Sequence, residues 1–260
     1  STLSKPRELE IHAGHWDALN SGANGVLNEV KENRRFAKRI FEILQSNKVP
    51  STYFEDNVSG NQRDNVNRII AHHNKDKDGL IVSVHFNASG TKTSRPIGTE
   101  VLYSTQKELA AELSKAISDA TGGGLLNRGA KYRKDLGILS RTYEPAVLIE
   151  VAFVNSTVDA AIYNRDFEKI CQATAKVLAK AVGKNLTQGK VEDELTFSSP
   201  SLKNKVSTIT SDKKLQQKVI KEGIKLEAFN ASWQDKFVKG GIKDGDWIGL
   251  YILYLEKGGK

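Results

Sequence analysis

The sequence predicts an α/β fold, with a twisted, mostly parallel or mixed sheet of about six strands and helices on both faces, followed by a small all-helical domain. Gly79 opens the run Leu80-Ile81-Val82-Ser83-Val84, which is apolar and rich in β-branched residues, as in a central strand buried on both faces. Short strand-like runs alternate with helical patterns as far as residue 183, which is the order of a layered α/β domain. Beyond residue 196 only helical patterns follow.

Each element is expected from its apolar spacing and its flanking turn residues. Strands are predicted at residues 8–13, 51–54, 80–88, 97–103, 136–139 and 146–153. Helices are predicted at residues 26–46, 60–75, 106–119 and 165–183, and then from near residues 199, 211, 231 and 244. The basic segment Asn127 to Lys131 is expected to be a loop at the rim of a site.

The apolar periodicity lapses at Gln188 to Glu194, which divides the chain into a domain at 1–186, a linker at 187–196 and a small helical domain at 197–260. The last segment carries 12 lysines against 7 acidic residues, so its net charge is +5 of the +8 for the whole chain. A segment of this size without metal or disulfide forms only a marginal core. Its aromatic residues are expected mainly to pack, with a carbohydrate-stacking surface as the alternative, namely Trp233, Trp247, Tyr251 and Tyr254.

Composition excludes several classes of protein. The only cysteine, Cys171, lies in a helical pattern and is expected in the core, so any metal site must rely on nitrogen and oxygen ligands. The net charge of +8 suits a polyanionic partner, but no phosphate-binding loop or Cys/His finger favours nucleic acid. The sequence contains no run of ~18 apolar residues, so we predict no membrane-spanning helix. Ser1 to Glu10 lacks the apolar region of a secretory signal, so we expect synthesis in the cytoplasm without one.

Three residues form a candidate metal-ligand set. His85 ends the central strand, His15 follows the first strand, and Glu29 lies near the start of the next helix. Alone, each histidine is more often a core or rim residue, and Glu29 more often compensates the helix dipole. A fourth residue, Glu150, lies inside the apolar strand 146–153 and is a candidate general base. Three protein ligands with an open position are typical of catalytic zinc.

Two further histidines do not fit this set. His72 and His73 are adjacent on a predicted helix, so their side chains point about 100° apart and cannot form an i, i+4 ligand pair. We expect both at the surface or at the rim of the domain.

Over about residues 7–184 the sequence resembles the zinc-dependent N-acetylmuramoyl-L-alanine amidases of the amidase-3 family. The resemblance implies His15, Glu29 and His85 as Zn²⁺ ligands and Glu150 as the catalytic carboxylate. The family more often has His-Gly-Gly around its first ligand, which leaves His12 as an alternative to His15; the spacing to Glu29 favours His15. The matching motifs are Ala13-Gly14-His15, Gly22-Ala23 with Glu29, Ser83-Val84-His85-Phe86-Asn87-Ala88, Arg128-Gly129 and Pro145 to Asn155.

The resemblance implies a peptidoglycan hydrolase that cleaves the amide between N-acetylmuramic acid and L-alanine, with Asn87 and Arg128 as candidate substrate contacts. The last segment is similar to small helical wall-attachment modules of phage lysins, which implies binding to peptidoglycan and to anionic wall polymers. We therefore expect a phage or prophage endolysin that reaches the wall after release from the host cytoplasm. The alternatives are a sporulation mother-cell autolysin, a zinc peptidase acting within the stem peptide, and a non-enzymatic basic binding protein.

Overall fold

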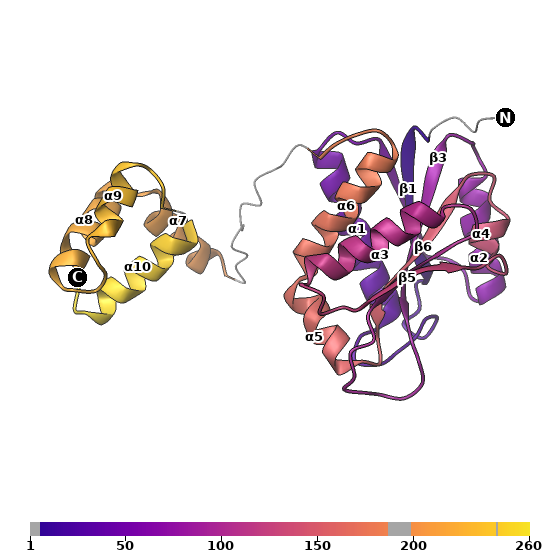
Figure 1. The fold of residues 1–260 in the computed structure, drawn as a ribbon, viewed down its shortest axis with the longest axis horizontal. Helices are drawn as coiled ribbons and strands as arrows, with labels where there is room; N and C mark the ends of the chain where they lie inside the picture. Colours follow the sequence, from indigo (N-terminus) through magenta and orange to yellow (C-terminus); the bar gives the residue numbers. More distant parts are fainter. Residues whose placement is uncertain (1–5, 187–198, 243) are drawn as a thin grey trace. The chain divides into compact units, whose positions relative to one another are not determined.

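The computed structural model describes residues 6–186, 199–242 and 244–260, and the chain divides into two compact units, 1–189 and 190–260 (Figure 1). The linker predicted at 187–196 lies outside the described residues. None of the described helices has both the length and the apolar character needed to cross a membrane.

The first unit is built on one six-stranded sheet in the order β2-β1-β3-β6-β4-β5. The first four strands in this order are parallel to one another, β4 is antiparallel to β6, and β5 is parallel to β4. The predicted mixed sheet is therefore confirmed. The strands are β1 (Glu8–Trp16), β2 (Ser51–Asp56), β3 (Gly79–Asn87), β4 (Thr99–Tyr103), β5 (Asn127–Tyr132) and β6 (Ala146–Phe153).

Helices cover both faces of this sheet, as predicted, and each face has its own apolar cluster. Figure 1 shows α1, α3, α5 and α6 on one side of the sheet and α2 and α4 on the other. The larger cluster lies on the first side and includes Phe36, Ile40 and Cys171, all fully buried. The helices are α1 (Glu29–Ser46), α2 (Gln62–His73), α3 (Lys107–Ala120), α4 (Gly137–Ser140), α5 (Thr157–Arg165) and α6 (Phe167–Ala181).

The helix α1 shows why these segments adopt their local structure. Its buried apolar residues recur every three or four positions, as one face of a helix requires. The Asn28 side chain accepts a hydrogen bond from the backbone N–H of Lys31 and so caps the first turn. Glu29 therefore becomes the first helical residue, at the carboxyl-terminal edge of the sheet.

The sequence-based assignment is wrong for three segments. Residues 137–140 form the helix α4, not a strand, because a short apolar run buried on one side fits either structure. The segment 127–132 is a strand, not a loop; β5 is an edge strand that pairs only with β4, so most of its side chains stay exposed and polar. The helix α5 was not predicted, although Ser156 caps it through the N–H of Asp159.

The second unit contains the expected helices, and most of its aromatic residues pack. Trp247 and Tyr254 are buried with Val219, Ile220 and Leu250, whereas Trp233 and Tyr251 lie only partly buried against this cluster. Its helices are α7 (Pro200–Ser211), α8 (Lys213–Lys225), α9 (Ser232–Val238) and α10 (Asp244–Glu256).

Candidate metal centre

Glu29 joins the two predicted histidines at the carboxyl-terminal edge of the sheet. Its Oε1 lies 2.9 Å from Nε2 of His15 and 3.0 Å from Nδ1 of His85. The two imidazole rings are nearly perpendicular, with their centroids 5.0 Å apart. The second oxygen of Glu29 accepts a 2.7 Å hydrogen bond from the backbone N–H of Ala23, which fixes the carboxylate. One donor atom from each of these three residues lies within 4.8 Å of the others.

The backbone of β1 and of the following loop makes room for this cluster. The pairing of β1 with β2 is irregular between His12 and Trp16, and His15 has a left-handed φ of 66°. Such an irregularity re-aims a side chain at a functional edge. A Cβ on Gly14 would lie 2.2 Å from the ring of His85, and one on Gly22 would lie 2.8 Å from Oε2 of Glu29. Only glycine permits this close approach at either position.

The charges of the cluster suit a cation. Burial alone would raise the pKa of Glu29, but the hydrogen bonds and charges of His15 and His85 outweigh it and hold this pKa well below its usual range. Burial lowers the pKa of His85, although Glu29 opposes the effect. A carboxylate between two largely buried imidazoles offers the nitrogen and oxygen donors that zinc takes in catalytic sites. The residues present therefore fit the ion that the sequence predicts.

Glu150 lies next to this cluster on β6. It is the register partner of His85 on β3 and of Glu100 on β4, so the three side chains form one row across three strands. Its Oε2 is buried without a hydrogen-bond partner. Burial, followed by the negative charges of Glu29 and Glu100, raises the pKa of Glu150 to about 8. A carboxyl group with a pKa near neutrality can both accept and return a proton.

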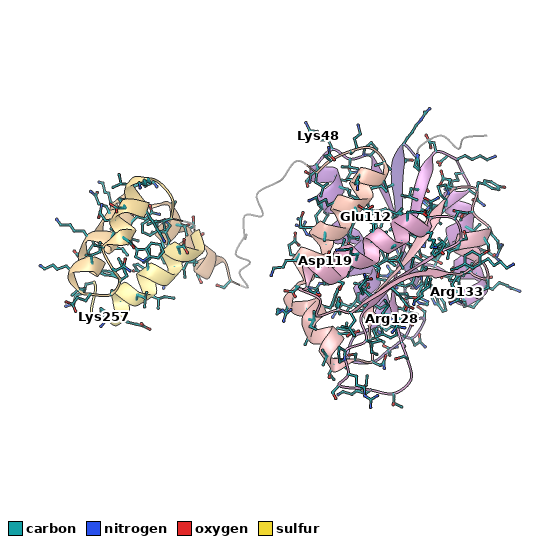
Figure 2. All side chains as sticks on the ribbon, in the orientation of Figure 1. Lys48, Glu112, Asp119, Arg128, Arg133 and Lys257 are labelled. Atoms are coloured by element: carbon teal, nitrogen blue, oxygen red, sulfur yellow. The ribbon has the colours of Figure 1, made fainter. Side chains whose placement is uncertain are left out.

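Glu100 was not predicted as a site residue, yet it organises both candidate substrate contacts. Its Oε1 accepts a 3.0 Å hydrogen bond from Asn87, and its Oε2 accepts one of 2.7 Å from Nε of Arg128. Arg128, labelled in Figure 2, projects from β5 and also lies over the ring of Phe153. The signal available in the sequence was a charged residue inside the strand-like run 97–103, the same signal that identified Glu150.

The structure separates His12 from the cluster and corrects the expectation for His73. His12 is fully buried, and its Nδ1 lies 2.8 Å from Nε2 of His73. His73 is only 1% exposed and contacts Glu10 through Nδ1, so it belongs to the interior and not to the rim. The helical pattern placed it next to His72 but could not show that β1 presents two polar partners to α2. His72 is partly buried and stacks on Phe54.

Comparison with known proteins identifies several relatives of this chain. A 38.4 kDa protein of Clostridium perfringens is 28% identical over 186 residues, which are 69% of this chain, and the chain spans about half (53%) of that relative. The catalytic domain of the CD27L endolysin targeting Clostridia Difficile is 27% identical with a TM-score of 0.55, covering 68% of this chain and 98% of that one.

The catalytic domain of CwlV, an N-acetylmuramoyl-L-alanine amidase from Bacillus (Paenibacillus) polymyxa var. colistinus, is 28% identical. Its TM-score is 0.54, and the match covers 67% of this chain and 97% of that chain. The profile described as N-acetylmuramoyl-L-alanine amidase (Amidase_3) matches residues 10–183, which is more than half of the chain. The protein therefore belongs to the N-acetylmuramoyl-L-alanine amidase family.

Proposed function

We propose that the protein is a zinc-dependent hydrolase that cleaves the amide between N-acetylmuramic acid and the L-alanine of the peptidoglycan stem peptide. The observation that carries this proposal is the position of Glu150, whose buried, unpartnered Oε2 lies in the same cross-strand row as His85. A three-donor cluster beside a free carboxyl oxygen is the arrangement expected for metal-assisted amide hydrolysis.

His15, Glu29 and His85 would hold the ion. Zinc bound by such a set supplies a Lewis acid that polarises a carbonyl group and acidifies water. The short contacts of Glu29 and the close packing of Gly14 and Gly22 keep the donors in place before any ligand arrives. The chain itself therefore contributes a pre-organised cradle.

Glu150 would move the proton. In the part of the chain that the structure describes, its Oε2 has no hydrogen-bond partner. This oxygen is therefore free to take a proton from water and to deliver it to the departing amine. Because the pKa of Glu150 is about 8, its protonated and ionised forms are both populated near neutral pH. Asn87 and Arg128 are both hydrogen-bonded to Glu100, which is the register partner of Glu150. We propose that these two side chains contact polar groups of the substrate.

We propose an endolysin as the biological role, with residues 197–260 as a cell-wall-binding domain. Similarity to an endolysin catalytic domain supports the role. The net charge of +5 on the last segment suits anionic wall polymers. In this proposal the protein is made in the host cytoplasm and acts on the wall after release.

Product identification tests the proposed reaction. Purified peptidoglycan is digested with the full chain, and the fragments are analysed by mass spectrometry. An amidase leaves a free lactyl carboxylate on the sugar and a new L-alanine amino terminus. Cleavage at any bond within the stem peptide would instead assign a peptidase, and intact peptidoglycan after incubation with zinc-loaded protein would remove the enzymatic proposal. The Glu150→Gln variant is the control for contaminating hydrolases.

A further inference from the structure

A second cluster of carboxylates lies at the opposite, amino-terminal edge of the same sheet. Three segments contribute to it: Glu8 and Glu10 on β1, Asp76 and Asp78 in the connection from α2 to β3, and Glu144 just before β6. Oxygen atoms of Glu8, Glu10 and Asp76 lie within 4.8 Å of one another, and the same holds for Asp76, Asp78 and Glu144. Asp76 belongs to both groups, so the five side chains form one continuous site.

Two of these carboxylates are buried and incompletely bonded. Glu10 is 4% exposed; one of its oxygens contacts His73, and Oε1 has no partner apart from the neighbouring carboxyl groups of Asp76 and Glu144. Glu144 is 5% exposed; its Oε1 accepts a 2.6 Å hydrogen bond from the N–H of Gly79, and Oε2 has no partner. A buried carboxylate oxygen without a partner costs free energy, and protein or bound ions normally satisfy such atoms.

Among the described residues, no permanent positive charge is paired with this cluster. Within the ranges that the structure describes, no lysine or arginine forms an ion pair with any of the five carboxylates. His73 touches Glu10, but burial lowers the pKa of His73 to about 4, so its ring is neutral at pH 7. Burial and the neighbouring carboxylates raise the pKa values of Glu10 and Glu144 to about 7. A bound cation would remove this mutual repulsion.

The sequence of the connecting loop points to the same kind of ligand. Oxygen-bearing side chains alternate with lysines in the segment Asn74-Lys75-Asp76-Lys77-Asp78-Gly79, which ends in glycine. The first half of a calcium-binding EF-hand loop has the same spacing of oxygen ligands before its glycine. The second half is missing, because β3 follows at once; Glu10 and Glu144 bring carboxylates from β1 and from the segment before β6 instead.

Asn74 differs from a direct ligand of that loop type. Its Oδ1 accepts a 2.9 Å hydrogen bond from the N–H of Tyr143, and its Nδ2 donates a 3.0 Å bond to the carbonyl of Arg141. Asn74 thereby fixes the segment that carries Glu144 against the loop that carries Asp76 and Asp78. Asn74 therefore helps to position the carboxylates and is not itself one of the ligands.

We propose that Glu8, Glu10, Asp76, Asp78 and Glu144 form a binding site for Ca²⁺, separate from the candidate zinc centre. Calcium is a hard cation that takes six to eight oxygen ligands at about 2.3–2.6 Å in flexible geometry, which suits carboxylates from three segments. Zinc prefers fewer ligands with nitrogen or sulfur among them. The ion would link the starts of β1, β3 and β6 and stabilise the first unit. This inference does not rest on the proposed enzymatic function.

Calorimetry and thermal unfolding of the full chain test the site. The protein first receives one equivalent of zinc, so that the His15 cluster does not compete, and Ca²⁺ is then titrated at constant ionic strength. We expect one Ca²⁺ per chain and a rise in Tm of roughly 5–10 °C at about 100 times the dissociation constant. Asp76→Asn and Asp78→Asn should abolish binding and the rise, because both residues are exposed ligands whose loss leaves the core intact.

The matched control is Asp119→Asn, which changes an exposed carboxylate on α3 that pairs with Lys115. It should bind Ca²⁺ like the wild type.

Tb³⁺ provides a second readout, since Tyr143 directly precedes Glu144 and should sensitise the emission of bound Tb³⁺. Added Ca²⁺ should displace Tb³⁺ and so remove this emission, and Tyr143→Phe should weaken it. No heat of binding in the wild type would overturn the proposal, as would equal Tm shifts in the wild type and Asp76→Asn, the sign of general charge screening.

Discussion

The two units differ most in what they bury. Among the described residues, the first unit buries several histidines and carboxylates, including His12, Glu10 and Glu29, whereas the second buries only one polar side chain, that of Gln216. The first unit can do so because a six-stranded sheet with helices on both faces excludes water from its interior. Perturbed pKa values need such an environment. The comparison therefore agrees with our proposal that acid–base and metal chemistry belong to the first unit.

The second unit offers a surface instead. Among its described residues the apolar core consists of five buried side chains, and α10 leaves Ile252, Leu253 and Leu255 exposed. Lysines dominate its charge. Attraction through exposed charges and apolar contacts requires no buried ionisable group, so this composition is compatible with the proposed attachment to a polymer. Substitutions in the first unit and removal of the second unit test this division.

Glu150→Gln should lower the hydrolysis rate by on the order of 10²–10⁴-fold, the range for a lost general acid/base, while zinc content stays normal. The amide keeps the size of the side chain and cannot carry the proton. Steady-state rates on purified peptidoglycan measure the effect, with Glu112→Gln on the exposed surface of α3 as the control. Should the variant unfold and its folded fraction remain fully active, Glu150 would be structural.

Removal of residues 190–260 should weaken binding to intact walls, on the order of tenfold or more, and leave cleavage of soluble muropeptides and zinc content unchanged. Attraction between exposed charges falls as salt shortens the Debye length to ~8 Å at 0.15 M. Added salt should therefore weaken wall binding of the full chain if lysines dominate, and leave it nearly constant if an aromatic site does.

Sedimentation of labelled residues 190–260 with purified host walls decides between attachment and simple packing. Co-sedimentation supports a wall-binding domain. If the labelled segment stays in solution at every salt concentration, it is not a wall anchor, and its helices serve stability or pairing between chains.

Glu100→Gln should lower kcat/KM roughly tenfold, because Arg128 loses a charge-assisted hydrogen bond while Asn87 keeps a neutral partner. The negative charge of Glu100 also raises the pKa of Glu150, so its removal should shift the pH profile to lower pH. The pH dependence of kcat/KM separates this positioning role from a structural one. An unshifted profile with a lower rate would contradict the electrostatic coupling.

Glu150→Gln should also stabilise the zinc-free protein in a pH-dependent way. Burial raises the pKa of Glu150 from its ordinary value near 4.5 to about 8, so folding favours the protonated form. The wild type consequently loses stability as pH rises from 4.5 towards 8, and the glutamine variant lacks this loss. The difference in Tm should be near zero at pH 4.5 and a few degrees at pH 8. A constant difference at both pH values would contradict the buried ionisation.

The approximate number of strands and the candidate site residues were predictable from the sequence, because buried strands have strong local patterns and the two histidines lie at strand ends. The run around His85 and the apolar strand around Glu150 predicted their positions, and the structure brings both together in one row. The edge strand β5 and the short helix α4 were not predicted, since neither carries a local period.

Two partnerships could not be read from the chain. Glu10 and His73 are 63 residues apart and meet only because α2 packs on β1. Glu100 binds Arg128 across β4 and β5, a contact that depends on the parallel pairing of these two strands. Long-range pairs between polar residues leave no spacing signal, whereas apolar alternation does.

The zinc content of the purified full chain tests most directly whether His15, Glu29 and His85 form a metal centre. We predict one zinc per chain in the wild type, and loss of most of it in His85→Ala, because two remaining ligands hold zinc poorly. His72→Ala, which removes a partly buried histidine stacked on Phe54, should keep one zinc and serves as the control. Full zinc occupancy in His85→Ala would place the ion elsewhere and contradict the proposed centre.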